Sequence, residues 1–105
     1  MKKSKEQIAR IKQMERYLVR TSAAVKRLSI ALDKYIAVQG AIKALDEYYS
    51  SETWKNDFAD DEAGLLPEDL KRGVLSEDGI WNLLSDSKDL NIRLRDTSDM
   101  LNSSK

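Results

Sequence analysis

One helical stripe runs from Ile11 to Tyr49, and its spacing constrains the fold more than any other feature of the chain. Steps of three and four residues alternate without a slip, and only Thr21, Gln39 and Asp46 are polar. This is the a/d pattern of a coiled-coil-like helix that packs along another helix. The stripe, called the first seam, consists of Ile11, Met14, Leu18, Thr21, Val25, Leu28, Leu32, Tyr35, Gln39, Ile42, Asp46 and Tyr49.

The first seam predicts a long helix over about residues 5–49, with Gly40 as its weak point because glycine costs roughly 1 kcal/mol relative to alanine inside a helix. A second seam predicts a C-terminal helix over about residues 77–101, with Ser76 as its N-cap. Strand-like alternation is missing. We therefore expect an all-α fold, in which the first helix packs antiparallel on the last as a helical hairpin or bundle. The second seam consists of Ile80, Leu83, Ser87, Leu90, Leu94, Thr97 and Leu101.

Short elements are expected in the acidic region between about residues 50 and 75. Ser51 can cap a helical turn that places Trp54 and Phe58 four residues apart, and residues 60–64 resemble a loop. Pro67 suits the first turn of a short helix over residues 67–72, which Gly73 can end. The large rings, Trp81 among them, are interpreted as core, with an exposed aromatic patch as the alternative.

Composition limits the possible functions. The 105 residues suit a single domain, and they include no histidine and no cysteine. The usual catalytic bases and soft metal ligands are therefore missing, so we predict no enzyme, no metal site and no cofactor. Charges recur too often for a membrane-spanning segment or a secretion signal, and no membrane contact is expected. The lack of cysteine fits a reducing compartment, which makes the cytoplasm the expected location.

Charge is divided along the chain although it sums to zero. Residues 1–45 carry eleven basic and three acidic side chains, a net charge of +8, so the remainder carries −8. Such polarity indicates either that the two parts attract each other or that each meets a different partner.

Basic residues of the first helix lie opposite the first seam. This basic stripe could follow a phosphate backbone or an acidic protein groove, although solvated charges are normal at the outer positions of a coiled coil. Few acidic residues accompany it, which is unusual. The stripe consists of Lys5, Lys12, Arg16, Arg20, Lys26, Arg27 and Lys34.

Charged residues of the acidic region are candidates for partner binding. An EF-hand interpretation fails because Ala59 and Glu62 stand where a ligand and a glycine are required, so a solvated acidic surface is favoured. The candidates, called the charged loop set, are Asp60, Asp61, Glu62, Glu68, Asp69, Lys71 and Arg72.

The stretch from Asp60 to Leu84, with the block Leu-Pro-Glu-Asp-Leu-Lys-Arg-Gly-Val-Leu-Ser-Glu-Asp, resembles the uncharacterised bacterial family called domain of unknown function 4298. The resemblance extends over most of the chain. It implies a small bacterial, cytoplasmic, all-helical protein, and it transfers no functional residue because the family has no established activity.

The function most compatible with these features is a non-enzymatic protein-interaction module, an adaptor or regulator. Self-association, most simply as a homodimer, is expected because the first seam is longer than the second. Two alternatives stay open. The protein could bind nucleic acid through the basic stripe, or it could mimic nucleic acid with its acidic region and inhibit a basic protein.

Overall fold

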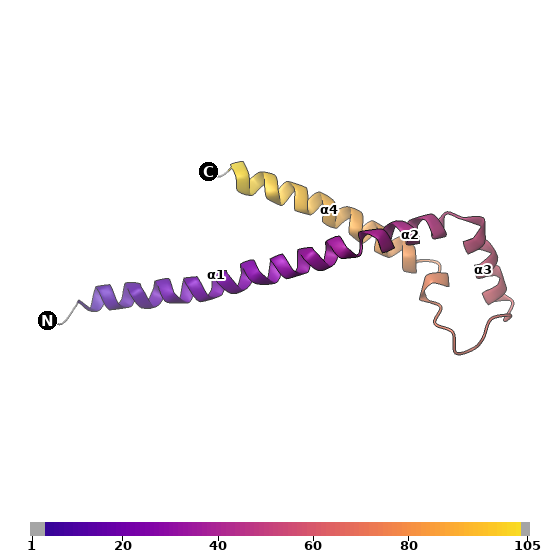
Figure 1. The fold of residues 1–105 in the computed structure, drawn as a ribbon, viewed down its shortest axis with the longest axis horizontal. Helices are drawn as coiled ribbons and strands as arrows, with labels where there is room; N and C mark the ends of the chain where they lie inside the picture. Colours follow the sequence, from indigo (N-terminus) through magenta and orange to yellow (C-terminus); the bar gives the residue numbers. More distant parts are fainter. Residues whose placement is uncertain (1–3, 104–105) are drawn as a thin grey trace. The chain divides into compact units, whose positions relative to one another are not determined.

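The computed structural model describes residues 4–103, and these residues form helices joined by turns (Figure 1). The helices are α1 (Lys5–Ala37), α2 (Gln39–Tyr49), α3 (Glu52–Glu62), the short 3-10 helix η1 (Gly73–Leu75) and α4 (Gly79–Ser103). The described residues contain no strand, so the predicted all-α class is confirmed. The chain divides into two compact units, Met1–Gln39 and Gly40–Lys105, called unit 1 and unit 2. Packing of α1 on α4 stays a prediction.

Helix α1 begins at an N-cap, where the Ser4 hydroxyl accepts a hydrogen bond from the Gln7 amide at 3.1 Å. The cap satisfies one of the amides that a helix start leaves without a partner. Thr21 interrupts the first seam, but its hydroxyl donates to the Tyr17 carbonyl of the preceding turn at 2.6 Å. The polar group of Thr21 is therefore satisfied within its own helix, and the residue does not need a polar partner across the seam.

The sequence left open whether the helix predicted over residues 5–49 continues through Gly40, and the structure interrupts it at Val38. The Val38 amide donates to the Tyr35 carbonyl at 3.3 Å, a tighter turn than in an α-helix. The Gln39 side chain donates to the same carbonyl at 2.9 Å. These two bonds stabilise the break, which falls two residues before Gly40. The weak position predicted from glycine is thus near the break but not at it.

Helix α3 begins as predicted and ends later than predicted. Ser51 is the N-cap, and its hydroxyl accepts from the Trp54 amide at 3.2 Å. The loop expected over residues 60–64 is wrong, because the helix continues to Glu62. Gly64 follows the C-cap Ala63, and its φ of 74° lies in the left-handed region that glycine adopts without strain. The Leu65 amide donates to the Asp60 carbonyl and the Gly64 amide to that of Asp61, both at 3.0 Å, which is a Schellman end.

The short helix expected over residues 67–72 is also wrong. This segment forms a turn in which the Leu70 amide donates to the Pro67 carbonyl at 3.2 Å, and the Arg72 guanidinium donates to the same carbonyl. A helix this short has an unfavourable nucleus and needs packing to stabilise it, yet Leu70 is exposed. Gly73 does not end a helix; it begins η1.

The best-buried residues of unit 2 lie where η1 contacts both α3 and α4 (Figure 1). Leu75 of η1 is 6% exposed and Ile80 of α4 is 3% exposed. Ser87, about two turns further along the second seam, is also buried. The core is therefore small, and it depends on the close approach of η1 to the start of α4.

Ser76 organises this approach. Its hydroxyl donates to the Gly73 carbonyl at 2.8 Å and accepts from the Gly79 amide at 3.0 Å. Ser76 therefore caps the turn as predicted, but α4 begins at Gly79 rather than near residue 77. A Cβ atom at Gly79 would lie 2.5 Å from both the Gly73 carbonyl oxygen and the Ser76 hydroxyl, so glycine is needed there for space.

We expect Gly79→Ala to lower the free energy of unfolding by about 1–3 kcal/mol, because the added methyl group overpacks the turn. Gly40→Ala is the control, because a Cβ atom there meets no atom within 4 Å and Gly40 lies in α2. Gly40→Ala should raise the free energy of unfolding by up to about 1 kcal/mol. Urea denaturation followed by circular dichroism measures both. Equal stability of the two variants would contradict the close approach.

Candidate interaction surfaces

The first seam leaves a continuous apolar surface along α1. No residue of this 33-residue helix is buried. Leu18 is 59% exposed, Val25 is 70% exposed, and Ile11, Met14 and Leu28 are each more than half exposed. Exposed apolar surfaces of this extent are typical of sites that contact another apolar surface, so this face of α1 is a candidate interaction surface.

The basic stripe lies on the same helix, and all seven of its side chains are exposed. Two of them have local partners: the Arg16 guanidinium donates to the Gln13 side chain, and the Arg20 guanidinium carbon lies 5.6 Å from the centre of the Tyr17 ring. A cation at this distance from an aromatic face is attracted to the ring. Such contacts orient the two arginines, and they leave their charges open to solvent.

The division of charge follows the division into compact units. Unit 1 carries ten basic and three acidic residues, a net charge of +7, and unit 2 carries eight basic and fifteen acidic residues, a net charge of −7. Opposite fields of this size attract each other over roughly 10 Å at moderate ionic strength.

Three aromatic side chains of unit 2 form a cluster around Trp54. The rings of Trp54 and Phe58 stack with their centres 5.2 Å apart, and Tyr49 meets Trp54 edge-on at 4.9 Å. The Trp54 indole donates to the Val74 carbonyl of η1 at 2.8 Å, which joins α3 to η1. The core interpretation thus suits Trp54. It is wrong for Trp81, which is 58% exposed on α4.

A second polar contact of unit 2 has no signal in the sequence. The Tyr48 hydroxyl donates to a carboxylate oxygen of Asp57 at 2.6 Å, across nine residues and the turn between α2 and α3. This hydrogen bond to Asp57, with smaller contributions from desolvation and from the negative charge of Asp57, raises the pKa of Tyr48 to about 12. The hydroxyl of Tyr48 therefore stays protonated, and able to donate this bond, to a higher pH than that of an ordinary tyrosine, and the bond fixes α2 against α3.

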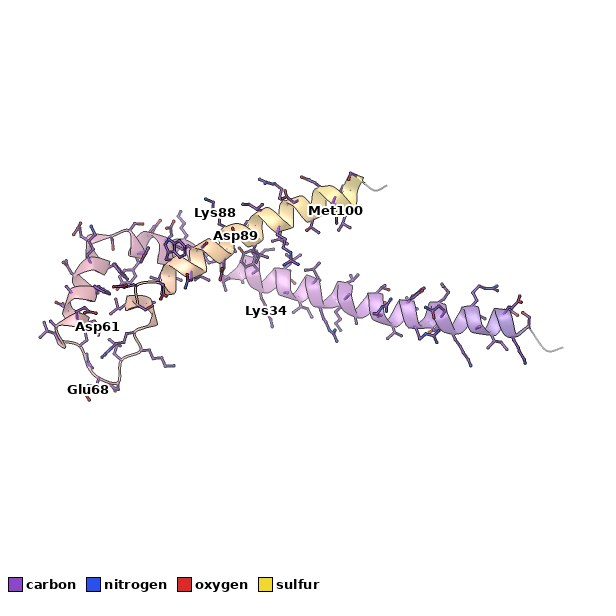
Figure 2. The ribbon with its side chains drawn as sticks, turned by 180° about the vertical axis from the view of Figure 1, so that it is seen from behind. Lys34, Asp61, Glu68, Lys88, Asp89 and Met100 are labelled. Atoms are coloured by element: carbon purple, nitrogen blue, oxygen red, sulfur yellow. The ribbon has the colours of Figure 1, made fainter. Side chains whose placement is uncertain are left out.

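The charged loop set divides into engaged and exposed residues. Asp61 of α3 and Arg72 form an ion pair, with 3.2 Å between a carboxylate oxygen and Nε, and both are half-buried. This Nε makes no well-aligned hydrogen bond, so the contact is ionic in character. The other five residues are exposed, and Glu68 lies at the far bend of the loop (Figure 2). The members of this set that are open to solvent are therefore Asp60, Glu62, Glu68, Asp69 and Lys71.

The acidic region has no arrangement suited to a metal ion. Asp57 and Asp61 both lie within helix α3, so the loop that an EF-hand requires is a helix here. In the described part of the chain, no three metal-ligating side chains come close enough to hold an ion. Two carboxylates of the proposed nucleic-acid mimic, those of Asp57 and Asp61, are also engaged within the chain.

Helix α4 presents the second seam. Beyond the buried Ile80 and Ser87, the apolar residues Leu83 and Leu90 are 42% and 38% exposed. Leu83 also lines a mostly apolar hollow of unit 2, together with Leu45, Val74 and Ile80. Unit 2 therefore has a partly open apolar surface that begins at this hollow and continues along α4.

The fold and these surfaces describe a small all-α protein with amphipathic helices. The chain belongs to the family described as Domain of unknown function (DUF4298), which matches residues 11–97 of the 105. The resemblance drawn from the sequence is thereby confirmed. None of the curated proteins and none of the solved structures matches the chain. None of the helices in residues 4–103 combines the length and the apolar character needed to cross a membrane.

We expect Trp54→Ala to lower the free energy of unfolding by about 2–4 kcal/mol, because it removes the ring stack and leaves the Val74 carbonyl without its donor. Trp81→Ala is the matched control, and it should cost less than about 1 kcal/mol because that indole is mostly exposed. Thermal melting monitored by circular dichroism compares the two variants. A larger loss for Trp81→Ala would contradict the assignment of Trp54 as the central ring.

Proposed function

We propose that the protein is a non-enzymatic helical interaction module, an adaptor or regulator of the bacterial cytoplasm, which associates with itself and with other proteins. The observation that carries this proposal is the apolar first seam of α1, which has no buried residue along 33 residues of helix. The spacing of the seam is that of helices that pair as a coiled coil. The lack of histidine and cysteine in the sequence supports a function without catalysis.

Self-association stabilises α1 in a way that the helix alone does not. Isolated helices are marginally stable in water, and most helical stability in proteins comes from packing of an apolar face. Burying a leucine-sized side chain is worth roughly 1.5–3 kcal/mol when it starts fully exposed. The side chains of the first seam start about half exposed. Burial of each side chain therefore contributes somewhat less free energy than this. Burial of the whole seam contributes enough free energy to offset the entropy lost on association.

Leu18→Asp tests this function. We expect the wild-type chain to show a mass of about two chains by light scattering. Leu18→Asp places a charge in the first seam and should shift the mass to one chain. The control is Val19→Asp, because Val19 is the next residue of α1, is 67% exposed and lies outside the seam. The control should keep the wild-type mass. A wild-type monomer at high micromolar concentration would refute the proposal.

Nucleic-acid binding is a second candidate function, favoured by the exposure of all seven residues of the basic stripe. From Lys12 to Lys34 the stripe extends for roughly 33 Å along the helix, close to one turn of duplex DNA. The net charge of zero and the sequence pI of about 6.3 oppose it, because proteins that bind nucleic acid are usually basic. This candidate therefore ranks below protein interaction.

If the basic stripe binds nucleic acid, replacing Arg16, Arg20 and Arg27 with glutamine should weaken binding of a duplex by at least about tenfold at low salt, and the wild-type affinity should fall steeply as salt rises. The control replaces Lys88, Arg93 and Arg95 of α4 with glutamine, which removes the same charge from unit 2. Fluorescence anisotropy with labelled DNA and RNA measures both. If the wild-type chain does not bind at low salt, this candidate is excluded.

A further inference from the structure

We infer that the surface that covers the first seam is unit 2 of a second copy of the chain, so that α1 of each copy packs on α4 of the other. This inference rests on the proposed self-association and names the two surfaces that meet. Three observations support it: the charge of the units, the composition of the seam borders and the open apolar surface of unit 2.

Charge separates the possible pairings of two copies. Pairing α1 with α1 brings together two units of net charge +7, whereas pairing α1 with unit 2 joins +7 to −7. Like charges at an interface cost free energy, and opposite fields both favour the encounter and exclude the wrong partner. The chain as a whole is neutral, so a reciprocal arrangement of two copies balances all of its charge.

The borders of the first seam are compatible with a close helix partner. Between Lys12 and Lys34 the positions that flank the seam are small or uncharged apart from Glu15. They include Ser22, Ala24, Ser29 and Ala31, all exposed. The basic side chains lie further out, where they act on the partner through their field rather than through direct pairs. The apolar contact thus uses the seam and its borders, and the charge attraction uses the outer positions of α1. Both favour unit 2 of the other copy as the partner.

Unit 2 has an apolar surface, the second seam, with the same spacing of three and four residues as the first seam. Leu83 and Leu90 of the second seam are partly exposed on α4, and the hollow lined by Leu45, Val74, Ile80 and Leu83 gives one end of that surface room for an additional side chain. Asp86, Asp89 and Asp99 are exposed on the same helix, which also carries the exposed basic residues Lys88, Arg93 and Arg95, and Figure 2 labels Lys88 and Asp89 there. Most of the negative charge of unit 2 therefore lies before α4, in residues 46–78. A reciprocal exchange of two such contacts has two-fold symmetry, which closes the assembly at a dimer.

A charge-exchange experiment tests the inference at low ionic strength. One variant carries Arg16→Glu, Arg20→Glu and Arg27→Glu, which lowers the charge of unit 1 from +7 to +1. The other carries Asp86→Lys, Asp89→Lys and Asp99→Lys, which raises the charge of unit 2 from −7 to −1. Each variant alone should self-associate at least about tenfold more weakly than the wild type. An equimolar mixture should form a mixed dimer, because one of its two contacts keeps the full +7 and −7.

Light scattering and native mass spectrometry of the wild type, each variant and the mixture give the result, and circular dichroism confirms that each variant is helical. Stronger self-association of the α1 variant than of the wild type would overturn the inference in favour of α1 pairing with α1. A mixture that associates no better than its components would also overturn it. A monomeric wild type would instead refute the proposed function itself, so the two failures are distinguishable.

Discussion

Unit 2 depends on the contact that Trp54 makes with η1. The indole ring stacks on Phe58 within α3 and donates a hydrogen bond to the Val74 carbonyl, so a single side chain joins a regular helix to the irregular segment that follows it. Once η1 is held, Leu75 and Ile80 become buried and the Ser76 turn directs the chain into α4. The ion pair of Asp61 and Arg72 and the bond from Tyr48 to Asp57 secure the same region from two sides. A core this small tolerates few changes at these positions.

Unit 1 is constrained differently, because it is one helix with no buried residue. A helix of this kind gains little from its own contacts and much from covering its apolar face. In the proposed assembly the opposite charges of the two units select the surface that covers this face, because the apolar seam alone does not distinguish one helix partner from another.

Several features of the fold could be predicted because they depend on neighbours three or four residues away. The all-α class, the cap at Ser51, the i to i+4 stack of Trp54 and Phe58, and the location of the basic stripe on one exposed helix all follow from such spacing. The loop expected over residues 60–64 was wrong because the acidic run at residues 60–62 was interpreted as a loop. These three residues are the last of helix α3, and Gly64 allows the chain to turn away after them. The short helix over residues 67–72 failed because the bonds of Arg72 favour a turn. The low helix propensity of Gly40 indicates a weak point near the interruption but not its position at Val38, because the Gln39 side chain that stabilises it looks like an ordinary helix former.

The sequence by itself determined the two amphipathic helices, their seams and the opposite charges of the two parts of the chain, because periodicity and charge are properties of adjacent residues. The family membership also follows from the sequence. Only the tertiary structure decided that Trp54 is a central ring while Trp81 is exposed, that Tyr48 bonds to Asp57, and that Asp61 and Arg72 are engaged with each other. These contacts join residues from nine to twenty positions apart in the sequence. Many side chains of the same type could make them, and the path of the turns between α2, α3 and η1 decides which ones meet.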